Sequence, residues 1–92
     1  MRVIVRDAAY ADLVHIRKWI HKERPASAVA VIEQIFDSIE RLALFPYMGH
    51  KGKVAGTLEW VVPGLPYVVV YQVDKKQREL HVIAVFHCAQ DR

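Results

Sequence analysis

The chain has 92 residues, which supply about enough apolar side chain for one core, so we expect a single domain over residues 1–92. Lysine and arginine exceed aspartate and glutamate by three, a balance that fits an acidic partner without requiring one. The one cysteine, Cys88, excludes an intramolecular disulfide, and the charged N-terminus excludes a signal peptide or membrane span there, so we expect a cytoplasmic protein with no membrane partner.

The first quarter of the chain is predicted to form a strand and a helix. RVIVR, residues 2–6, alternates charged and β-branched side chains, as a short half-buried strand does. Asp7 follows as the expected N-cap of the helix. Apolar residues then recur at steps of four, three and four, the period of a helix with one buried stripe: Ala9, Leu13, Ile16 and Ile20. Pro25 disfavours helical geometry at Arg24 and is suited to the first turn of a new helix.

The second helix has the clearest periodicity in the chain. Its buried stripe is predicted to contain Ala28, Ile32, Ile35, Ile39 and Leu42, widened by Val31 and Phe36. Pro46 and Gly49 indicate an end near Phe45. The short link between the helices predicts an antiparallel hairpin, and residues 47–56, rich in glycine and lysine, are predicted to form a loop.

Three strand-like runs complete the chain: TLEWVV (57–62), PYVVVYQV (66–73) and ELHVIAVF (79–86). Pro63-Gly64 and the polar turn DKKQ separate them, and such short links predict an antiparallel meander. The predicted fold class is α+β in the order β-α-α-β-β-β, with the helical hairpin packed on one face of a mainly antiparallel four-stranded sheet.

The charged residues are divided between the two helices. The first helix carries the basic residues Arg17, Lys18, His21, Lys22 and Arg24. The second carries the acidic residues Glu33, Asp37 and Glu40. The simpler interpretation is two solvated faces with some ion pairing across the hairpin, since exposed pairs are common and contribute little. The functional interpretation is a docking surface that includes Arg17, Lys18 and Lys22.

The segment GHKGK, residues 49–53, is superficially similar to a phosphate-binding loop. No Ser or Thr follows its last lysine, and no strand-to-helix junction holds it. A solvated turn is the simpler interpretation, and a basic loop in which Lys51 and Lys53 approach a phosphate is the functional one.

Five histidines raise the question of a metal. There is no second cysteine and no HxxxH or HExxH spacing, so we expect neither a metal nor a cofactor. His87 ends the last strand near Arg92, where a side chain can leave the core, and is a weak catalytic candidate beside a structural interpretation. Cys88 is set aside as a partner for His87, because adjacent strand residues point to opposite faces.

Taken in order, these blocks resemble the RelE/ParE superfamily of type II toxin-antitoxin toxins, also known as plasmid stabilisation proteins. The resemblance rests on AAYADLVHIRKWI before a proline, ASAVAVIEQIFDSIERLALFP, GKVAGTLEWVV, PYVVVY and VIAVFHCAQ. It covers nearly the whole chain and implies the strand, helical hairpin and meander described above. It also implies one of two activities: RelE-like members cleave messenger RNA in the ribosome, whereas ParE-like members inhibit DNA gyrase.

Cleavage of RNA through its 2′-hydroxyl needs a base, a cation for the developing phosphorane charge and an acid, all on one face of the sheet. At the places where RelE-like ribonucleases carry basic or aromatic groups, this sequence has Glu59, Val61, Val68 and Cys88. A valine cannot stabilise a phosphorane, and Glu59 would repel the phosphate. PYVVVY is therefore interpreted as core, and the protein is expected not to be a RelE-like enzyme.

The resemblance therefore favours the ParE-like branch: a growth-inhibiting toxin that binds DNA gyrase and is neutralised by an antitoxin in a hetero-oligomeric complex. The apolar fraction of 53% is consistent with a surface that the antitoxin covers. Expected target-binding residues are Arg17, Lys18, Lys22, Lys51, Lys53 and Arg92. One alternative is a ribosome-dependent endoribonuclease acting on mRNA, with His87 as acid or base and Lys51, Lys53 or Arg92 supplying charge. Another is an inactive relative that binds only its antitoxin.

Overall fold

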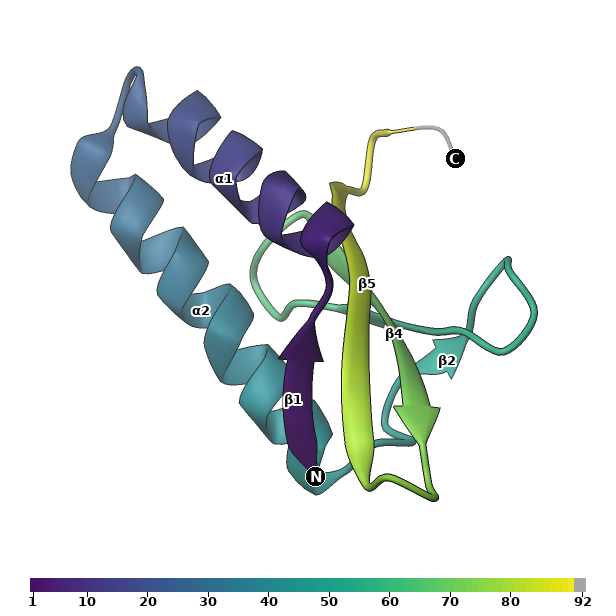
Figure 1. Cartoon of the computed structure of the whole chain (residues 1–92). Coiled ribbons are helices and arrows are strands. Elements are labelled where there is room, and N and C mark those ends of the chain that lie inside the picture. The colour runs from purple at the N-terminus through teal and green to yellow at the C-terminus, as the bar shows by residue number, and fades with distance from the viewer. Residues whose placement is uncertain (91–92) are drawn as a thin grey trace.

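The computed structural model describes residues 1–90 and contains two helices on one side of a twisted sheet (Figure 1). The helices are α1 (Asp7–His21) and α2 (Pro25–Leu44). The strands are β1 (Arg2–Val5), β2 (His50–Lys51), β3 (Leu58–Val61), β4 (Tyr67–Asp74) and β5 (Glu79–His87). The predicted α+β class and the hairpin on a mainly antiparallel sheet are both confirmed.

The sheet has the order β1-β5-β4-β3-β2, with β1 parallel to β5 and every other pair antiparallel. We expected four strands, and the structure adds β2, which lies inside the segment predicted as a loop. Its two residues pair with β3 as His50↔Glu59 and Lys51↔Leu58. A strand of two residues has no alternation of its own, so its pairing is decided by the neighbouring strand rather than by local pattern.

The helices begin and end close to the predicted positions, with two local corrections. Arg6 occupies the N-cap position of α1 without a side-chain hydrogen bond, and Asp7 is the first helical residue. The Asp7 carboxylate therefore lies in the first turn, where it complements the helix dipole instead of capping the backbone. Phe36 was predicted to widen the buried stripe of α2, but it is 38% exposed, and Ser38 is buried on that helix instead.

The core lies between the helices and one face of the sheet. Its helical residues include Ala9, Leu13, Ile35, Ile39 and Leu42. The sheet contributes Val62, Tyr67, Val69, Tyr71, Leu80, Val82 and Val85. Tyr71 is fully buried, and its hydroxyl donates to the Pro46 carbonyl at 2.8 Å and accepts from the Gly49 amide at 3.0 Å. All five residues from Tyr67 to Tyr71 are buried, which confirms the core prediction for these five residues of PYVVVY, whereas Pro66 is exposed.

A β-bulge in β5 changes which residues share a face. Tyr71 pairs with Val82 and Val70 with Ala84, so Ile83 has no partner on β4. The extra residue shifts the alternation by one position. His87 pairs with Tyr67 on the face that the helices cover, whereas His81 lies on the opposite face, which we call the open face.

Within residues 1–90, neither α1 nor α2 combines the length and the apolar character needed to cross a bilayer.

Candidate interaction surfaces

His87 lies at the C-terminal end of β5 beside α1. Its ring meets the Tyr67 ring edge to face, with centroids 5.4 Å apart and planes at 86°. Its Nδ1 accepts a hydrogen bond from the Ala89 amide at 3.0 Å, and Nε2 has no partner within residues 1–90. The ring contact and this hydrogen bond hold the imidazole in place and leave Nε2 as its one free nitrogen. Burial also raises the pKa of the neighbouring Tyr67 hydroxyl.

A hollow of about 470 Å³ lies next to this imidazole. It is lined by His15, Ile16, Trp19, Tyr67, His87 and Gln90. Trp19 is 72% exposed and lies on the same helix as His15. The hollow is aromatic and contains no lysine or arginine, so it can hold an apolar or aromatic group but offers no cation to a phosphate.

Three of the positions that the sequence resemblance matches to RelE-like basic groups lie on the open face of the sheet. Glu59 pairs with Val70 and Val61 with Val68, so these side chains share that face. Glu59 is 9% exposed and accepts a hydrogen bond from the Lys53 amide at 3.3 Å, and Val68 is 6% exposed. His87 lies on the other face. The acid or base candidate and these positions therefore do not form one site.

The basic residues of α1 form an exposed surface. Arg17, Lys18 and Lys22 are all exposed, and Lys22 Nζ lies 5.7 Å from the centre of the Trp19 ring. Among residues 1–90 no ion pair joins α1 to α2, so the pairing that we expected across the hairpin is not found there. We call Arg17, Lys18, Trp19 and Lys22 the α1 basic face.

Lys51 and Lys53 lie far from His87. Lys51 is on β2, which is three strands from β5, about 14 Å across the sheet at the usual spacing. It is also level with Tyr71, four residues or about 13 Å along β4 from the partner of His87. The structure does not bring these lysines to the imidazole. Arg92, the remaining predicted residue, lies outside the described part of the chain.

One group of potential metal ligands occurs among the described residues. Asp74, Glu79 and His81 place ligand atoms within 4.8 Å of one another. Glu79 is already paired with Arg2 and, at 3.0 Å, with His81. The hydrogen bond from Arg2, followed by that from His81, lowers the pKa of the Glu79 carboxyl. Ion pairs therefore account for Glu79 and His81, and Asp74 accepts a hydrogen bond from the Gln77 amide at 3.0 Å.

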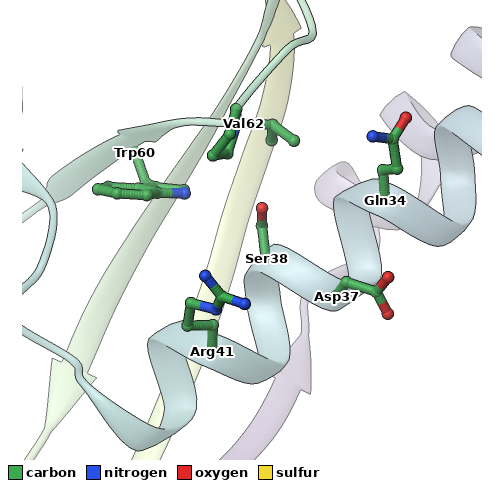
Figure 2. Close-up of a pocket in the computed structure, with 7 residues that line it drawn as sticks. Gln34, Asp37, Ser38, Arg41, Trp60 and Val62 are labelled. Atoms are coloured by element: carbon green, nitrogen blue, oxygen red, sulfur yellow. The ribbon is translucent and has the colours of Figure 1, made fainter.

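Sequence reasoning missed a groove between α2 and β3. It has a volume of about 210 Å³ and is lined by Gln34, Asp37, Ser38, Arg41, Trp60, Val62 and Pro63 (Figure 2). Its residues come from segments some 20 positions apart, and each part of the pattern indicates an ordinary helix or strand. A buried Ser38 opposite a strand tryptophan has no signature in the sequence alone.

Comparison with known proteins agrees with this architecture. Residues 3–92 match the family model described as the ParE toxin of the type II toxin-antitoxin system parDE. The chain is similar to a Sinorhizobium fredii protein named as a candidate toxin, Y4kP, with 30% identity over 82 residues, 89% of this chain and 82% of that protein.

Solved structures show the same fold. The chromosomal ParDE toxin-antitoxin system from P. aeruginosa matches with a TM-score of 0.83 and 18% identity over 95% of each chain. The intact E. coli RelBE complex matches with a TM-score of 0.69 and 15% identity over 99% of this chain and 98% of that one. The RelBE2 complex from Mycobacterium tuberculosis matches with a TM-score of 0.59 and 26% identity over 94% and 95%.

The fold and these matches define a toxin of the RelE/ParE superfamily. More narrowly, the chain belongs to the ParE toxin family of type II toxin-antitoxin systems.

Proposed function

We propose that this toxin inhibits growth by binding DNA gyrase and that a cognate antitoxin neutralises it in the cytoplasm. The observation that carries the proposal is the chemistry of the open face. The three positions matched to RelE-like basic groups hold Glu59, Val61 and Val68, and two of these three side chains are buried. Without a cation at these three positions, the part of the open face that corresponds to a RelE-like site lacks the group that would stabilise a phosphorane.

The position of His87 supports the same proposal. Cleavage of RNA needs its acid, base and cation around one phosphate. His87 is on the helix side of the sheet, and the lysines Lys51 and Lys53 are on or beyond its far edge. A surface that binds another protein has no such requirement, so binding is the activity that this arrangement supports best.

An antitoxin partner is supported by the matched structures and by the surface of this chain. The P. aeruginosa and E. coli structures are toxin-antitoxin systems. Several large apolar side chains are exposed here: Tyr10, Trp19, Val29, Leu44, Phe45, Tyr47, Val54 and Val61. Scattered exposed apolar residues are normal, but this number on a small chain fits a protein that is covered by a partner.

The test is a plasmid supercoiling assay with purified gyrase and antitoxin-free protein. The proposal expects loss of supercoiling or accumulation of linear DNA, reversed when the antitoxin is added in equal amount. The same preparation heated until unfolded is the control. A folded sample that leaves supercoiling unchanged at several-fold excess over gyrase excludes gyrase as the target.

A second candidate, ribosome-dependent mRNA cleavage, is favoured by one observation: the free Nε2 of His87 faces a hollow that also contains His15. The variants His87→Ala and His15→Ala separate it from gyrase inhibition in a translating-ribosome assay. Cleavage that only the His87 variant loses would establish the enzyme. If a folded protein neither cleaves mRNA nor inhibits gyrase nor slows growth, it is the inactive relative that binds only its antitoxin.

A further inference from the structure

The groove between α2 and β3 contains an unsatisfied hydrogen-bond donor. Within residues 1–90, Trp60 Nε1 is the one buried side-chain nitrogen or oxygen without a hydrogen-bond partner. An indole N–H can only donate, and leaving such a group buried and unpaired is unfavourable because its hydrogen bond to water is lost and not replaced. Such a group needs an explanation, and an acceptor supplied by a bound partner is one.

The neighbouring side chains add further donors to the same space. Figure 2 shows Ser38 and Arg41 reaching from α2 toward the nitrogen edge of Trp60, whereas the carboxylate of Asp37 points away from the groove. Arg41 is exposed and makes no ion pair within residues 1–90. A hydroxyl and a guanidinium therefore line the hollow beside the buried indole N–H, and the Asp37 carboxylate is not directed into it.

The size and walls of the groove limit the ligand. A volume of about 210 Å³ has room for several water molecules or one short side chain. Val62, Pro63 and the Trp60 ring form an apolar wall on the sheet side. Because its free cation is beside the indole donor, the groove fits a carboxylate better than a neutral carbonyl, which would leave the Arg41 charge unused.

We propose that this groove binds the carboxylate of an aspartate or glutamate side chain of the antitoxin, held by Trp60 Nε1, Arg41 and Ser38. The inference rests on the proposed toxin-antitoxin pairing, and it adds the position and chemistry of one contact. Charge complementarity with Arg41 selects an acidic residue, and the small volume selects a side chain rather than a helix.

The first test uses this chain alone and a probe of known chemistry. The chain has two tryptophans, so an NMR spectrum of the ¹⁵N-labelled protein contains two indole N–H signals, from Trp19 and Trp60. Titration with sodium acetate is expected to move the Trp60 signal and leave that of Trp19, which serves as the internal control. Acetamide, which is similar in shape and neutral, is expected to move it at least severalfold less. An unmoved Trp60 signal, or equal shifts with acetamide, contradicts the proposal.

The second test measures antitoxin affinity for three variants. Trp60→Phe keeps the apolar ring and removes the donor, and Arg41→Gln removes the charge; each is expected to weaken binding about tenfold. Asp37→Asn removes a negative charge at the edge of the groove and is expected to tighten binding about two- to fivefold. Arg78→Gln, on the exposed turn between β4 and β5, is the matched control and is expected to have no effect.

The outcomes separate the two proposals. If the unchanged chain does not bind the antitoxin, the toxin-antitoxin pairing fails, and the acetate titration alone decides the carboxylate site. If the antitoxin binds and Trp60→Phe and Arg41→Gln leave its affinity unchanged, the groove inference is wrong and the proposed function stands. Loss with Trp60→Phe but not with Arg41→Gln indicates a backbone carbonyl and contradicts a carboxylate. A dimer of this chain that Trp60→Phe dissociates identifies a second copy as the occupant and likewise overturns the inference.

Discussion

Gly49 is a residue at which the fold leaves no room for a side chain. A Cβ atom there would lie 2.6 Å from the Tyr71 hydroxyl oxygen and 2.7 Å from the Glu59 carbonyl oxygen. Its amide donates to that same hydroxyl at 3.0 Å, so the close approach is part of the hydrogen bonding that holds the buried tyrosine. The sequence marks this glycine only as a helix-ending signal. The reason for it is the tyrosine 22 positions later.

Gly49→Ala is therefore expected to destabilise the protein by about 2–3 kcal/mol, because the backbone must move and the hydrogen bond to Tyr71 is weakened. Urea denaturation followed by tryptophan fluorescence measures the change. Gly64→Ala is the matched control: no atom lies within 4 Å of its Cβ, but its φ is +76°, so a cost of only about 1 kcal/mol is expected. Equal losses in the two variants would contradict the steric explanation.

A second prediction at the residue scale concerns Glu79. Its pairing with Arg2 and His81 lowers the pKa of the carboxyl below the ordinary 4.5. A lowered folded-state pKa means that the stabilising contribution is fully present above pH 4.5 and is lost as the pH falls through the folded-state pKa. Denaturation midpoints measured from pH 7 downward should fall less steeply for Glu79→Gln than for the unchanged chain. Glu40→Gln, on the exposed side of α2, should keep the original slope, and parallel curves for all three proteins would refute the assignment.

At the scale of elements, the sequence predicts helices and strands whose apolar pattern repeats. It misses features that depend on pairing with a neighbouring strand. The stripe from Ala28 to Leu42 is long and regular, so α2 could be placed almost to the residue. Strand β2 and the bulge at Ile83 could not be found this way. One is too short to show a pattern, and the other interrupts a pattern that otherwise continues through HVIAVFH. The bulge also places His81 and His87 on opposite faces, which even spacing would have placed on one.

Docking of α1 onto β5 depends on a hydrogen bond close to the bulge. The Asp12 carboxylate on α1 accepts from the Val85 amide at 2.9 Å, two residues after Ile83. Asp12→Ala removes the acceptor and leaves a partly buried N–H, with an expected loss of about 1–3 kcal/mol. The Val85 amide should then exchange its hydrogen faster than the Val82 amide, as measured by NMR. Asp37→Ala, on an exposed position of α2, is the control, and unchanged exchange at Val85 in the Asp12 variant would show that the bond does not hold the helix.

At the scale of the whole molecule, the sequence predicted the fold and family better than the candidate sites. The predicted cations are dispersed: Arg17 and Lys18 lie on α1 with Lys22 at its C-cap, and Lys51 and Lys53 lie at the far edge of the sheet. The groove with Trp60 was not predicted, because a buried donor without a partner becomes visible only when the strand and helix are packed together. Hydrophobic periodicity predicts which residues are buried, but it does not predict which of their hydrogen-bonding groups lack a partner.

Because the cations are dispersed, the contribution of the α1 basic face to gyrase inhibition can be measured separately from that of the net charge. Replacing Arg17, Lys18 and Lys22 with glutamate changes the net charge from +3 to −3, since each substitution removes one positive and adds one negative charge. If this face contacts gyrase and its DNA, inhibition of supercoiling should weaken at least about tenfold, and the remaining inhibition should depend less on salt. Replacing Lys75, Lys76 and Arg78, on the turn between β4 and β5, makes the same net change elsewhere and should weaken inhibition far less.

Equal losses would show that long-range charge, and not this face, governs the encounter. No loss in the α1 variant, with its unfolding curve unchanged, would remove the α1 basic face from the binding surface.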